Sequence, residues 1–258
     1  MRIVRYLRRR KPCWGVVEEN SVRSLRGDPF SRVQRGKDVV PLSAARLLPP
    51  AVPGKIILAG LNYKDHAREL GMRVPREPVI FLKPPTALTG PQSPIIYPRG
   101  VKRVDYEAEL AVVVGKPARN IREKDVFRHI LGYTCLNDVT ARDLQKKDGQ
   151  WTRSKSFDTF CPVGPWIETA FNPESALICS FVNGKRKQCS TTAQFIFSVP
   201  FLVSWISRVM TLLPGDIIST GTPPGVGELK PGDTVSVVID GIGELSNPVV
   251  AAAGGTKN

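Results

Sequence analysis

The chain has 258 residues, enough for one large domain or for one domain with a small appendage. Its 41% hydrophobic and 23% charged residues are typical of a soluble globular protein, and its 23 prolines and 22 glycines favour a β-rich fold over a helical bundle. No apolar run reaches the roughly 20 residues that span a bilayer, and the N-terminus lacks the apolar core of a signal peptide, so we expect a cytoplasmic protein with no membrane partner.

The formal net charge of +14 predicts attraction to anions. The densest basic run is the N-terminal one, which could be a phosphate-contacting arm or a targeting peptide; it contains Arg2, Arg5, Arg8, Arg9, Arg10 and Lys11. Elsewhere the basic residues are dispersed, without the interleaved aromatic residues that stack on bases. The charge therefore favours small anionic substrates over nucleic acid.

The cysteine pattern argues against a zinc site and against a disulfide framework. The number is odd and no pair has CxxC spacing; the residues are Cys13, Cys135, Cys161, Cys179 and Cys189. We therefore expect reduced thiols in a reducing compartment. A catalytic cysteine–histidine pair is disfavoured, because neither His66 nor His129 has a local context that singles out a thiol.

The first 50 residues predict a small β-rich N-terminal domain. MRIVRY, WGVVE and SVRSL are short strand candidates separated by polar turns. The proline-rich stretch LLPPAVPG, residues 47–54, is the best candidate for a boundary. We accordingly divide the chain into residues 1–50 and a larger catalytic region, residues 51–258.

A short helix is expected directly after the buried strand KIILAG, residues 55–60. Asn62 can cap it and Gly71 suits its end. On such a helix His66 and Glu69 share a face, where a carboxylate can orient an imidazole for acid–base chemistry. A polar pair on the surface is the alternative. The loop VPREP follows, which would place the helix on a mobile segment.

Two further helices are predicted. Residues 120–131 carry a cap signal at Asn120 and an apolar stripe of Val126, Phe127 and Ile130. Residues 198–213 predict a second helix with Ser198 as its cap and Pro214-Gly215 at its end.

Strands account for most of the rest. PVIFLKPP and IIYP precede the middle of the chain, LGYTCLND lies within it, and a strand-rich region follows Pro173 with a hairpin turn at Asn183-Gly184. Residues 216–227 predict a strand and a glycine-rich turn without the features of a P-loop or a Rossmann site, so we do not expect ATP or NAD to bind there. TVSVVID and GELSNPVV close the chain as two strands.

The stretch VDYEAELAVVVG, residues 104–115, alternates with period two. Asp105, Glu107 and Glu109 fall on one face, and the two glutamates project about 7 Å apart along a strand. The strand runs on into residues that are apolar on both faces, which indicates entry into a core where unpaired carboxylates are unfavourable. A hard divalent cation would hold them there; a solvated amphipathic strand is the alternative.

Several separated motifs together resemble the fumarylacetoacetate hydrolase family. They run in family order from about residue 55 to 247: GLNYKDHARE, FLKPPTAL, VDYEAELAVVVG, GYTCLNDVTARDLQ, QWTRSKSFDTFCPVGPW, FSVPFLVSWIS with TLLPGD, and TGTPPGVG. The front region resembles the small N-terminal domain of bacterial members. TTAQFIF departs from the commoner TSxMIF form, and we expect this difference to affect packing or the shape of the accepted substrate more than the chemistry.

The resemblance implies a mixed α/β, β-rich fold with a β-sandwich or β-roll catalytic domain, in a homodimer. It implies Mg²⁺ or Mn²⁺, with Ca²⁺ as a further option, bound by Glu107, Glu109 and Asp138. It also implies catalytic and substrate-binding residues, which are His66, Glu69 and Lys155 for catalysis and Arg142, Gln145 and Thr222 for substrate.

The activity that the resemblance favours is metal-dependent hydrolysis of a C–C bond in 2,4-dioxo acids of the acylpyruvate or fumarylpyruvate type, through a metal-stabilised enolate. The alternatives belong to aromatic compound catabolism: 2-hydroxyhepta-2,4-diene-1,7-dioate isomerase, or a decarboxylase of 5-carboxymethyl-2-oxo-hex-3-ene-1,6-dioate or oxaloacetate. The alternatives outside this class of enzymes are a non-catalytic protein and a nucleic-acid-binding protein.

Overall fold

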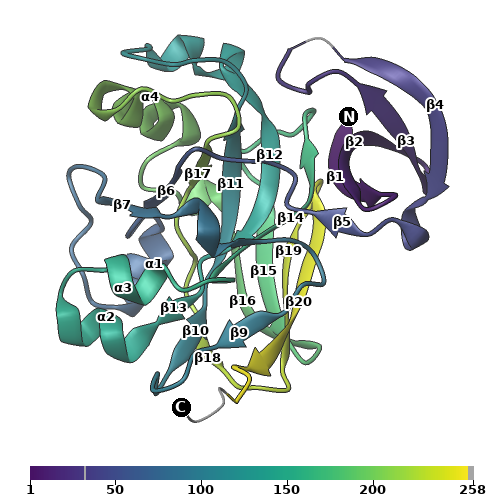
Figure 1. The fold of residues 1–258 in the computed structure, drawn as a ribbon. Coiled ribbons are helices and arrows are strands. Elements are labelled where there is room, and N and C mark those ends of the chain that lie inside the picture. Colours follow the sequence, from purple (N-terminus) through teal and green to yellow (C-terminus); the bar gives the residue numbers. More distant parts are fainter. Residues whose placement is uncertain (32, 255–258) are drawn as a thin grey trace.

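Strands dominate the computed structural model, which describes residues 1–31 and 33–254 (Figure 1). The largest sheet has twelve strands. Ten of them follow one another in the spatial order β4 (Gln34–Pro41), β3 (Ser21–Arg26), β2 (Lys11–Glu18), β1 (Arg2–Arg8), β14 (Cys161–Glu168), β12 (Ile130–Asn137), β11 (Ala108–Val114), β17 (Ile217–Ser219), β6 (Ile56–Ala59) and β7 (Ile80–Lys83). The short strands β5 (Leu47–Leu48) and β8 (Leu88–Thr89) pair with β1 and β14.

Two smaller sheets and a few helices complete the described part of the chain. One sheet has the order β16 (Lys185–Thr191), β15 (Leu177–Val182), β19 (Thr234–Ile239), β20 (Gly243–Ala251) and β9 (Ile95–Tyr97), and the other has β13 (Thr140–Ala141), β10 (Val104–Tyr106) and β18 (Gly227–Leu229). The α-helices are α1 (Lys64–Glu69), α2 (Arg142–Asp148), α3 (Thr152–Lys155) and α4 (Val199–Val209). Short 3₁₀ helices are η1 (Leu42–Ala44), η2 (Pro85–Ala87), η3 (Glu123–Arg128) and η4 (Thr192–Gln194). The expected mixed, β-rich fold is confirmed.

Strand β11 lies at the centre of the core, as its apolar run predicts. Val112 and Val114 pack into the cluster between the large sheet, the five-stranded sheet and α4, whereas Ala111 and Val113 pack into a second cluster on the opposite face. Fully burying a side chain of this size contributes roughly 1.5–3 kcal/mol. The carboxylates of the same strand are thus held by a segment that is anchored on both sides.

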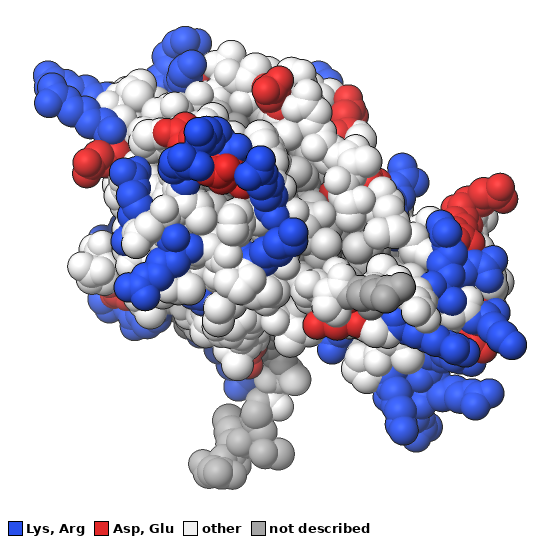
Figure 2. All heavy atoms as spheres, turned by 90° about the horizontal axis from the view of Figure 1, so that it is seen from above, with Lys and Arg blue, Asp and Glu red and all other residues white. Residues whose placement is uncertain are grey.

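The N-terminal strands continue the large sheet. The three predicted strands form β1, β2 and β3, and β4 adds a fourth that was not predicted. Arg2 and Ile3 of β1 pair with Glu168 and Ile167 of β14, so the hydrogen-bonded path runs without interruption into the larger region. Figure 2 shows basic side chains gathered on the right of the view, where the N-terminal strands lie, whereas basic and acidic side chains are mixed over the rest of this face. None of the described helices has the length and apolarity needed to cross a membrane.

The predicted helix at residues 62–71 exists as α1, but Asn62 does not cap it. The N-cap residue is Tyr63 and makes no side-chain hydrogen bond to the helix. Asn62 is instead buried, donates to the carbonyls of Phe197 at 3.2 Å and Thr220 at 2.7 Å, and accepts from the Phe197 backbone N–H at 2.8 Å. Its side chain ties three chain segments together at the base of α1.

The two other predicted helices need correction. Residues 123–128 form the 3₁₀ helix η3 rather than an α-helix, Asn120 has a φ of 52° outside it, and Phe127 is exposed. The helix capped by Ser198 is confirmed as α4, but it ends at Val209 rather than at Pro214. The early end of α4 follows from the β-bridge between Ala118 and Leu212, which holds the segment after the helix extended.

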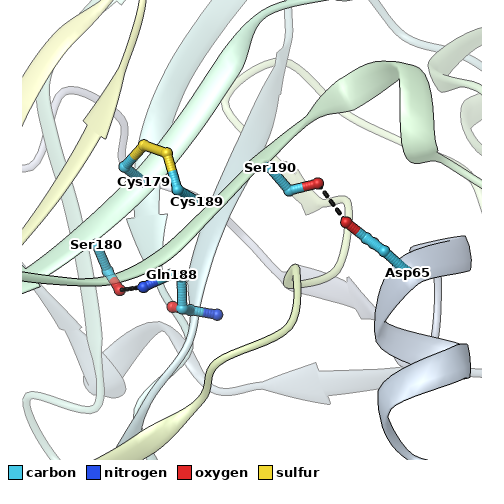
Figure 3. The surroundings of a disulfide bond; sticks show 6 residues. All are labelled: Asp65, Cys179, Ser180, Gln188, Cys189 and Ser190. Carbon is cyan, nitrogen blue, oxygen red and sulfur yellow. Dashed lines mark hydrogen bonds between the residues drawn. A yellow bond between two sulfur atoms is a disulfide. The ribbon is translucent and has the colours of Figure 1, made fainter.

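The hairpin at Asn183-Gly184 is confirmed, and it overturns one expectation about the thiols. Both turn residues have positive φ, 51° and 75°, as a tight hairpin requires. The resulting register sets Cys179 directly opposite Cys189 on β15 and β16, and the two form a disulfide (Figure 3). The expectation of reduced thiols is therefore wrong for this pair, whereas Cys13, Cys135 and Cys161 are free.

Replacing Asn62 tests its structural role. Asn62→Ala leaves three buried backbone groups without their partner, so we expect the free energy of unfolding to fall by about 3 kcal/mol. Asn20→Ala, at an exposed turn position, should change it by less than about 0.5 kcal/mol. Urea unfolding followed by circular dichroism measures both, and equal stability of the two variants would contradict the prediction.

Candidate metal centre and active site

Three predicted carboxylates converge in the core. Glu109 lies on β11, Glu107 in the break between β10 and β11, and Asp138 just after β12. The antiparallel pairing of β11 with β12 places Ala108 opposite Asn137, and the Asp138 backbone N–H donates to the Glu107 carbonyl at 2.9 Å. One oxygen from each carboxylate lies within 4.8 Å of the others, and all three residues are buried.

The ammonium of Lys155, at the end of α3, bridges two of these carboxylates. Its Nζ donates to Oδ2 of Asp138 at 2.5 Å and to Oε2 of Glu107 at 3.0 Å. Burial would lower the pKa of Lys155, but Asp138 and Glu107 outweigh it, so the pKa lies above its usual value. Burial likewise would raise the pKa of Glu107, which Lys155 and Arg142 instead hold well below the usual range. Lys155 and Glu107 are therefore both charged.

The pKa of Glu109 is shifted in the opposite direction to that of Glu107. Burial, together with the nearby charges of Asp138 and Glu107, raises its pKa well above the usual value. Its Oε2 accepts hydrogen bonds from the Ser219 hydroxyl and from the Gly221 N–H at 3.0 Å. Ionised Glu109 thus lacks a cationic partner of its own.

The donor set fits a hard divalent cation. All three groups offer carboxylate oxygens, the ligand type that Mg²⁺, Mn²⁺ and Ca²⁺ prefer. Glu109 is buried beside two other carboxylates and is short of positive charge. Glu107, Glu109 and Asp138 would therefore hold such an ion, as the family resemblance implies.

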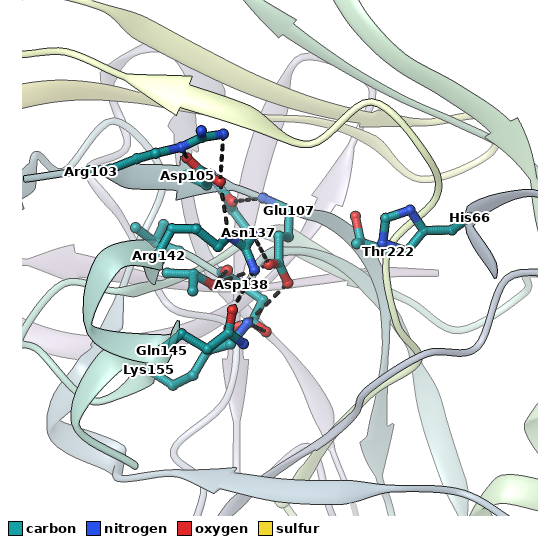
Figure 4. Close-up of polar contacts among 12 residues, drawn as sticks. His66, Arg103, Asp105, Glu107, Asn137, Asp138, Arg142, Gln145, Lys155 and Thr222 are labelled. Carbon is teal, nitrogen blue, oxygen red and sulfur yellow. Dashed lines mark hydrogen bonds and ion pairs between the residues drawn. The ribbon is translucent and has the colours of Figure 1, made fainter. Parts of the chain in front are cut away.

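A guanidinium network orders the side of the site next to the carboxylates (Figure 4). Arg142 donates through Nε to Asp105 at 2.9 Å, through one terminal nitrogen to Gln145 at 2.6 Å, and through the other to Glu107. Arg103 also donates to Asp105, at 2.8 and 3.2 Å. Asp105 was not among the predicted site residues, although its position on the same alternating face as Glu107 and Glu109 is the signal that could have found it.

The predicted histidine–glutamate pair forms on α1. Nδ1 of His66 lies 2.8 Å from Oε2 of Glu69, and the other oxygen of Glu69 accepts from the Gly225 N–H at 3.0 Å. The Ser190 hydroxyl donates to Asp65 at 2.5 Å and anchors the helix from a second direction. Figure 4 shows His66 beside Thr222, apart from the carboxylate and guanidinium cluster.

Thr222 is held by protein contacts at the edge of the site. Its hydroxyl donates to the Ala108 carbonyl at 2.9 Å and accepts from Gln188 Nε2 at 2.8 Å. Gln188 also accepts from the Ala108 N–H at 3.0 Å, so it fixes both the turn that carries Thr222 and the chain between the two glutamates. Gln188 was missed, since a glutamine in an exposed-looking KRKQ run gives no sign of burial.

A cavity of about 530 Å³ brings most of these residues together. Seven of the nine predicted site residues line it, namely His66, Glu107, Asp138, Arg142, Gln145, Lys155 and Thr222. Glu69 and Glu109 are not among the residues that line it. The remaining wall is largely apolar and includes Leu61, Leu70, Met72, Phe81, Trp151 and Val226. The cavity therefore has a charged floor and a wall suited to an apolar chain.

The structure thus brings three buried carboxylates, a lysine and a histidine close to one cavity. The family profile "Fumarylacetoacetate (FAA) hydrolase C-terminal" matches residues 55–250, and the profile "Rv2993c-like, N-terminal" matches residues 1–50. The chain belongs to the fumarylacetoacetate hydrolase family, whose members are enzymes.

Three similar proteins show the range of activities among relatives. A 5-carboxymethyl-2-hydroxymuconate delta-isomerase from Mycobacterium smegmatis is 43% identical with a TM-score of 0.93, and the match covers 98% of this chain and 100% of that one. A mitochondrial oxaloacetate tautomerase from Xenopus laevis is 45% identical over 85% of this chain and 73% of its own. A maleylpyruvate hydrolase from Sphingobium sp. SYK-6, solved with manganese(II) and pyruvate, is 32% identical with a TM-score of 0.82, over 98% and 100%.

Glu109→Gln separates metal binding from stability. Glutamine keeps an acceptor for Ser219 and Gly221 but removes a buried charge beside two carboxylates, so the metal-free variant should be at least as stable as the wild type. Its affinity for Mn²⁺ should fall by more than about 100-fold, because a ligand is lost rather than one of its supporting partners. Calorimetric titration and thermal unfolding measure the two effects.

The exposed Glu244, on β20, provides the matched control. Glu244→Gln should leave both the Mn²⁺ affinity and the unfolding temperature at the wild-type values. Wild-type Mn²⁺ affinity in Glu109→Gln would remove Glu109 from the proposed ligand set.

Proposed function

We propose that this protein is a divalent-metal-dependent hydrolase that cleaves a C–C bond in 2,4-dioxo acids of the acylpyruvate type. The observation that carries the proposal is that the His66–Glu69 pair and the carboxylate–lysine centre face one cavity. C–C hydrolysis needs a base for water and a stabiliser for the carbanion that leaves. This cavity supplies both, on different walls.

The charged floor would bind the 2-oxo acid end of the substrate. Mg²⁺ or Mn²⁺, held by Glu107, Glu109 and Asp138, would polarise the 2-oxo group as a Lewis acid. Lys155, buried at 2% side-chain exposure, would stabilise the negative charge that develops there as the C–C bond breaks. We further propose that Arg142, Gln145 and Thr222 orient the substrate from the adjoining walls.

The histidine pair would act at the 4-carbonyl. Glu69 can only accept, so it holds the Nδ1 proton of His66 and leaves Nε2 as the basic nitrogen. Nε2 would take a proton from the water that attacks the 4-carbonyl. Cleavage then releases a carboxylic acid, and the three-carbon fragment takes up the proton to leave as pyruvate. The apolar wall formed by Leu70, Met72 and Val226 suits the acyl chain.

The second candidate is an isomerase or tautomerase of 2-oxo dicarboxylic acids. The 43% and 45% identities to an isomerase and to an oxaloacetate tautomerase favour it. The same centre would stabilise the enolate, and His66 would move a proton between two carbon or oxygen atoms without adding water. Decarboxylation of oxaloacetate draws on the same enolate. In all cases the substrate is a small anion, and we infer a homodimer from the family resemblance.

A metal-titrated assay on metal-stripped protein tests the proposal. Acetylpyruvate, fumarylpyruvate, oxaloacetate and a 2-hydroxy-diene-dioate are followed by ultraviolet absorbance, with chromatographic identification of products. We expect Mn²⁺- or Mg²⁺-dependent release of pyruvate and a carboxylic acid from an acylpyruvate. Spectral change of the diene or of oxaloacetate without C–C cleavage would favour the isomerase or tautomerase, and loss of CO₂ the decarboxylase.

Replacing His66 tests the assignment of the base. His66→Gln should lower kcat for acylpyruvate cleavage by roughly 10²–10⁴-fold, the usual contribution of a general base. Mn²⁺ affinity should stay within about twofold of the wild type, since His66 does not contact the carboxylates. His129→Gln is the matched control, because the His129 side chain hydrogen-bonds only to the Pro117 carbonyl among the described residues. Hydrolysis at the wild-type rate in His66→Gln would refute the assignment.

A further inference from the structure

Lys83, the last residue of β7, is a buried cation that the proposed mechanism does not use. Its side chain has 0% exposure, and its Nζ lies 2.6 Å from Oδ1 of Asp138. It also donates to the backbone carbonyls of Val139, at 3.0 Å, and of Phe160. The FLKPPTAL motif supports the family resemblance, but neither the sequence nor the comparisons give this lysine a role.

The geometry of β7 directs Lys83 into the site. Side chains two residues apart share a face of a strand, so Lys83 points the same way as Phe81, while Leu82 points outward and is exposed. The Phe81 ring lines the cavity and lies 5.0 Å from Nζ of Lys155. The short strand β7 therefore supplies Phe81 to the cavity wall and Lys83 to a contact with Asp138 outside the cavity lining.

Asp138 is held between two lysines that contact different oxygens. Lys155 contacts Oδ2, on the side of Glu107, and Lys83 contacts Oδ1. Because Lys83 also contacts two carbonyls, its ammonium is fixed in three directions and cannot follow Asp138 if that side chain rotates. The contact therefore sets the rotation of the carboxylate.

We propose that Lys83 is a positioning residue, which turns Oδ1 of Asp138 away from the cation and presents Oδ2 to it. This inference rests on the proposed metal centre. Carboxylates that ligate metals are generally held by such outer partners. An apolar residue at position 83 would leave Oδ1 buried with neither a hydrogen bond nor a counter-ion among the described residues.

The charge of Lys83 also balances the site. The four acidic residues Asp105, Glu107, Glu109 and Asp138 are matched by the four basic residues Arg103, Arg142, Lys83 and Lys155. With all eight ionised their charges cancel, so a divalent cation adds a surplus of two positive charges. A 2-oxo acid carries one negative charge on its carboxylate and gains a second on its 2-oxo group as the bond breaks. Without Lys83 the surplus of the metal-bound site falls to one positive charge, which no longer equals the two negative charges of the substrate.

The test is Mn²⁺ binding by metal-stripped protein, measured by calorimetry and by the electron paramagnetic resonance of free Mn²⁺. We expect Lys83→Met to weaken the affinity about 10- to 100-fold, the usual effect of removing a partner of a metal ligand. Lys83→Gln keeps a donor for the Val139 carbonyl but loses the charge, and we expect an intermediate loss. Because glutamine preserves part of the polar packing, it carries the test if the methionine variant does not fold.

Lys55→Met is the matched control. Lys55 directly precedes Ile56, which pairs with Lys83, so the two lysines lie at the same end of the β6–β7 pairing. Lys55 instead forms an ion pair with buried Asp216 and does not line the cavity. Its replacement should lower the unfolding temperature but leave the Mn²⁺ affinity at the wild-type value. The control therefore shows whether a loss of stability alone is enough to weaken Mn²⁺ binding.

Wild-type affinity in both Lys83 variants, or an equal loss in Lys55→Met, would overturn the positioning role. If the wild-type protein binds no Mn²⁺, the proposed metal centre fails first, and the inference falls with it. The wild-type titration therefore distinguishes the two failures.

Discussion

The burial of three like charges on neighbouring strands is the constraint on which the structure depends. Glu107, Glu109 and Asp138 are buried together at the start of β11 and just after the end of β12. Carboxylates at such a place destabilise a fold unless cations or hydrogen-bond donors face them. Each nearby element supplies one: α3 brings Lys155, α2 brings Arg142, the end of β17 brings Ser219, and β7 brings Lys83. The arrangement of helices and edge strands around β11 follows from this requirement.

The same requirement gives the proposed role of Lys155 a physical basis in the resting protein. In the described structure Lys155 bridges Asp138 and Glu107, close to where a shared cation would lie. A divalent ion would neutralise these carboxylates more strongly than an ammonium does, because it carries twice the charge. The Lys155 ammonium, which already lies near the Phe81 ring, would then be available to a bound anion. Under the proposal, metal binding and the availability of Lys155 would thus be linked.

How far the sequence predicted the site depended on whether the signal was local. Glu107 and Glu109 were found because period two along one strand is visible in the letters, and His66 and Glu69 because a helix places them on one face. Lys83, Gln188 and Asn62 were missed or misassigned, since their burial depends on pairing between segments far apart in the chain. No local pattern separates a buried lysine from a solvated one.

The same distinction applies to the fold. Local turn chemistry gave the hairpin at Asn183-Gly184, but the disulfide across it follows from the register that the turn imposes, which spacing alone did not reveal. The N-cap of α4 was read correctly because Ser198 acts on its own helix. The end of α4 was not, because the bridge between Ala118 and Leu212 holds the following segment extended against its helical periodicity. Pairing between distant segments thus decided what the local pattern predicted wrongly.

The two halves of the proposed chemistry are attached to the protein in different ways. The carboxylates and lysines belong to the sheet core, whereas His66 and Glu69 belong to a six-residue helix. That helix is joined to the turn at Gly225 through Glu69, and to Ser190 of β16 through Asp65. Displacing α1 would therefore move the base without disturbing the centre that stabilises the enolate. Under the proposed mechanism, a water molecule between Nε2 and the substrate would end the enolate chemistry in hydrolysis, and its exclusion would end it in proton transfer. The proposal therefore places the choice between these two outcomes at the docking of α1 rather than at the carboxylate centre.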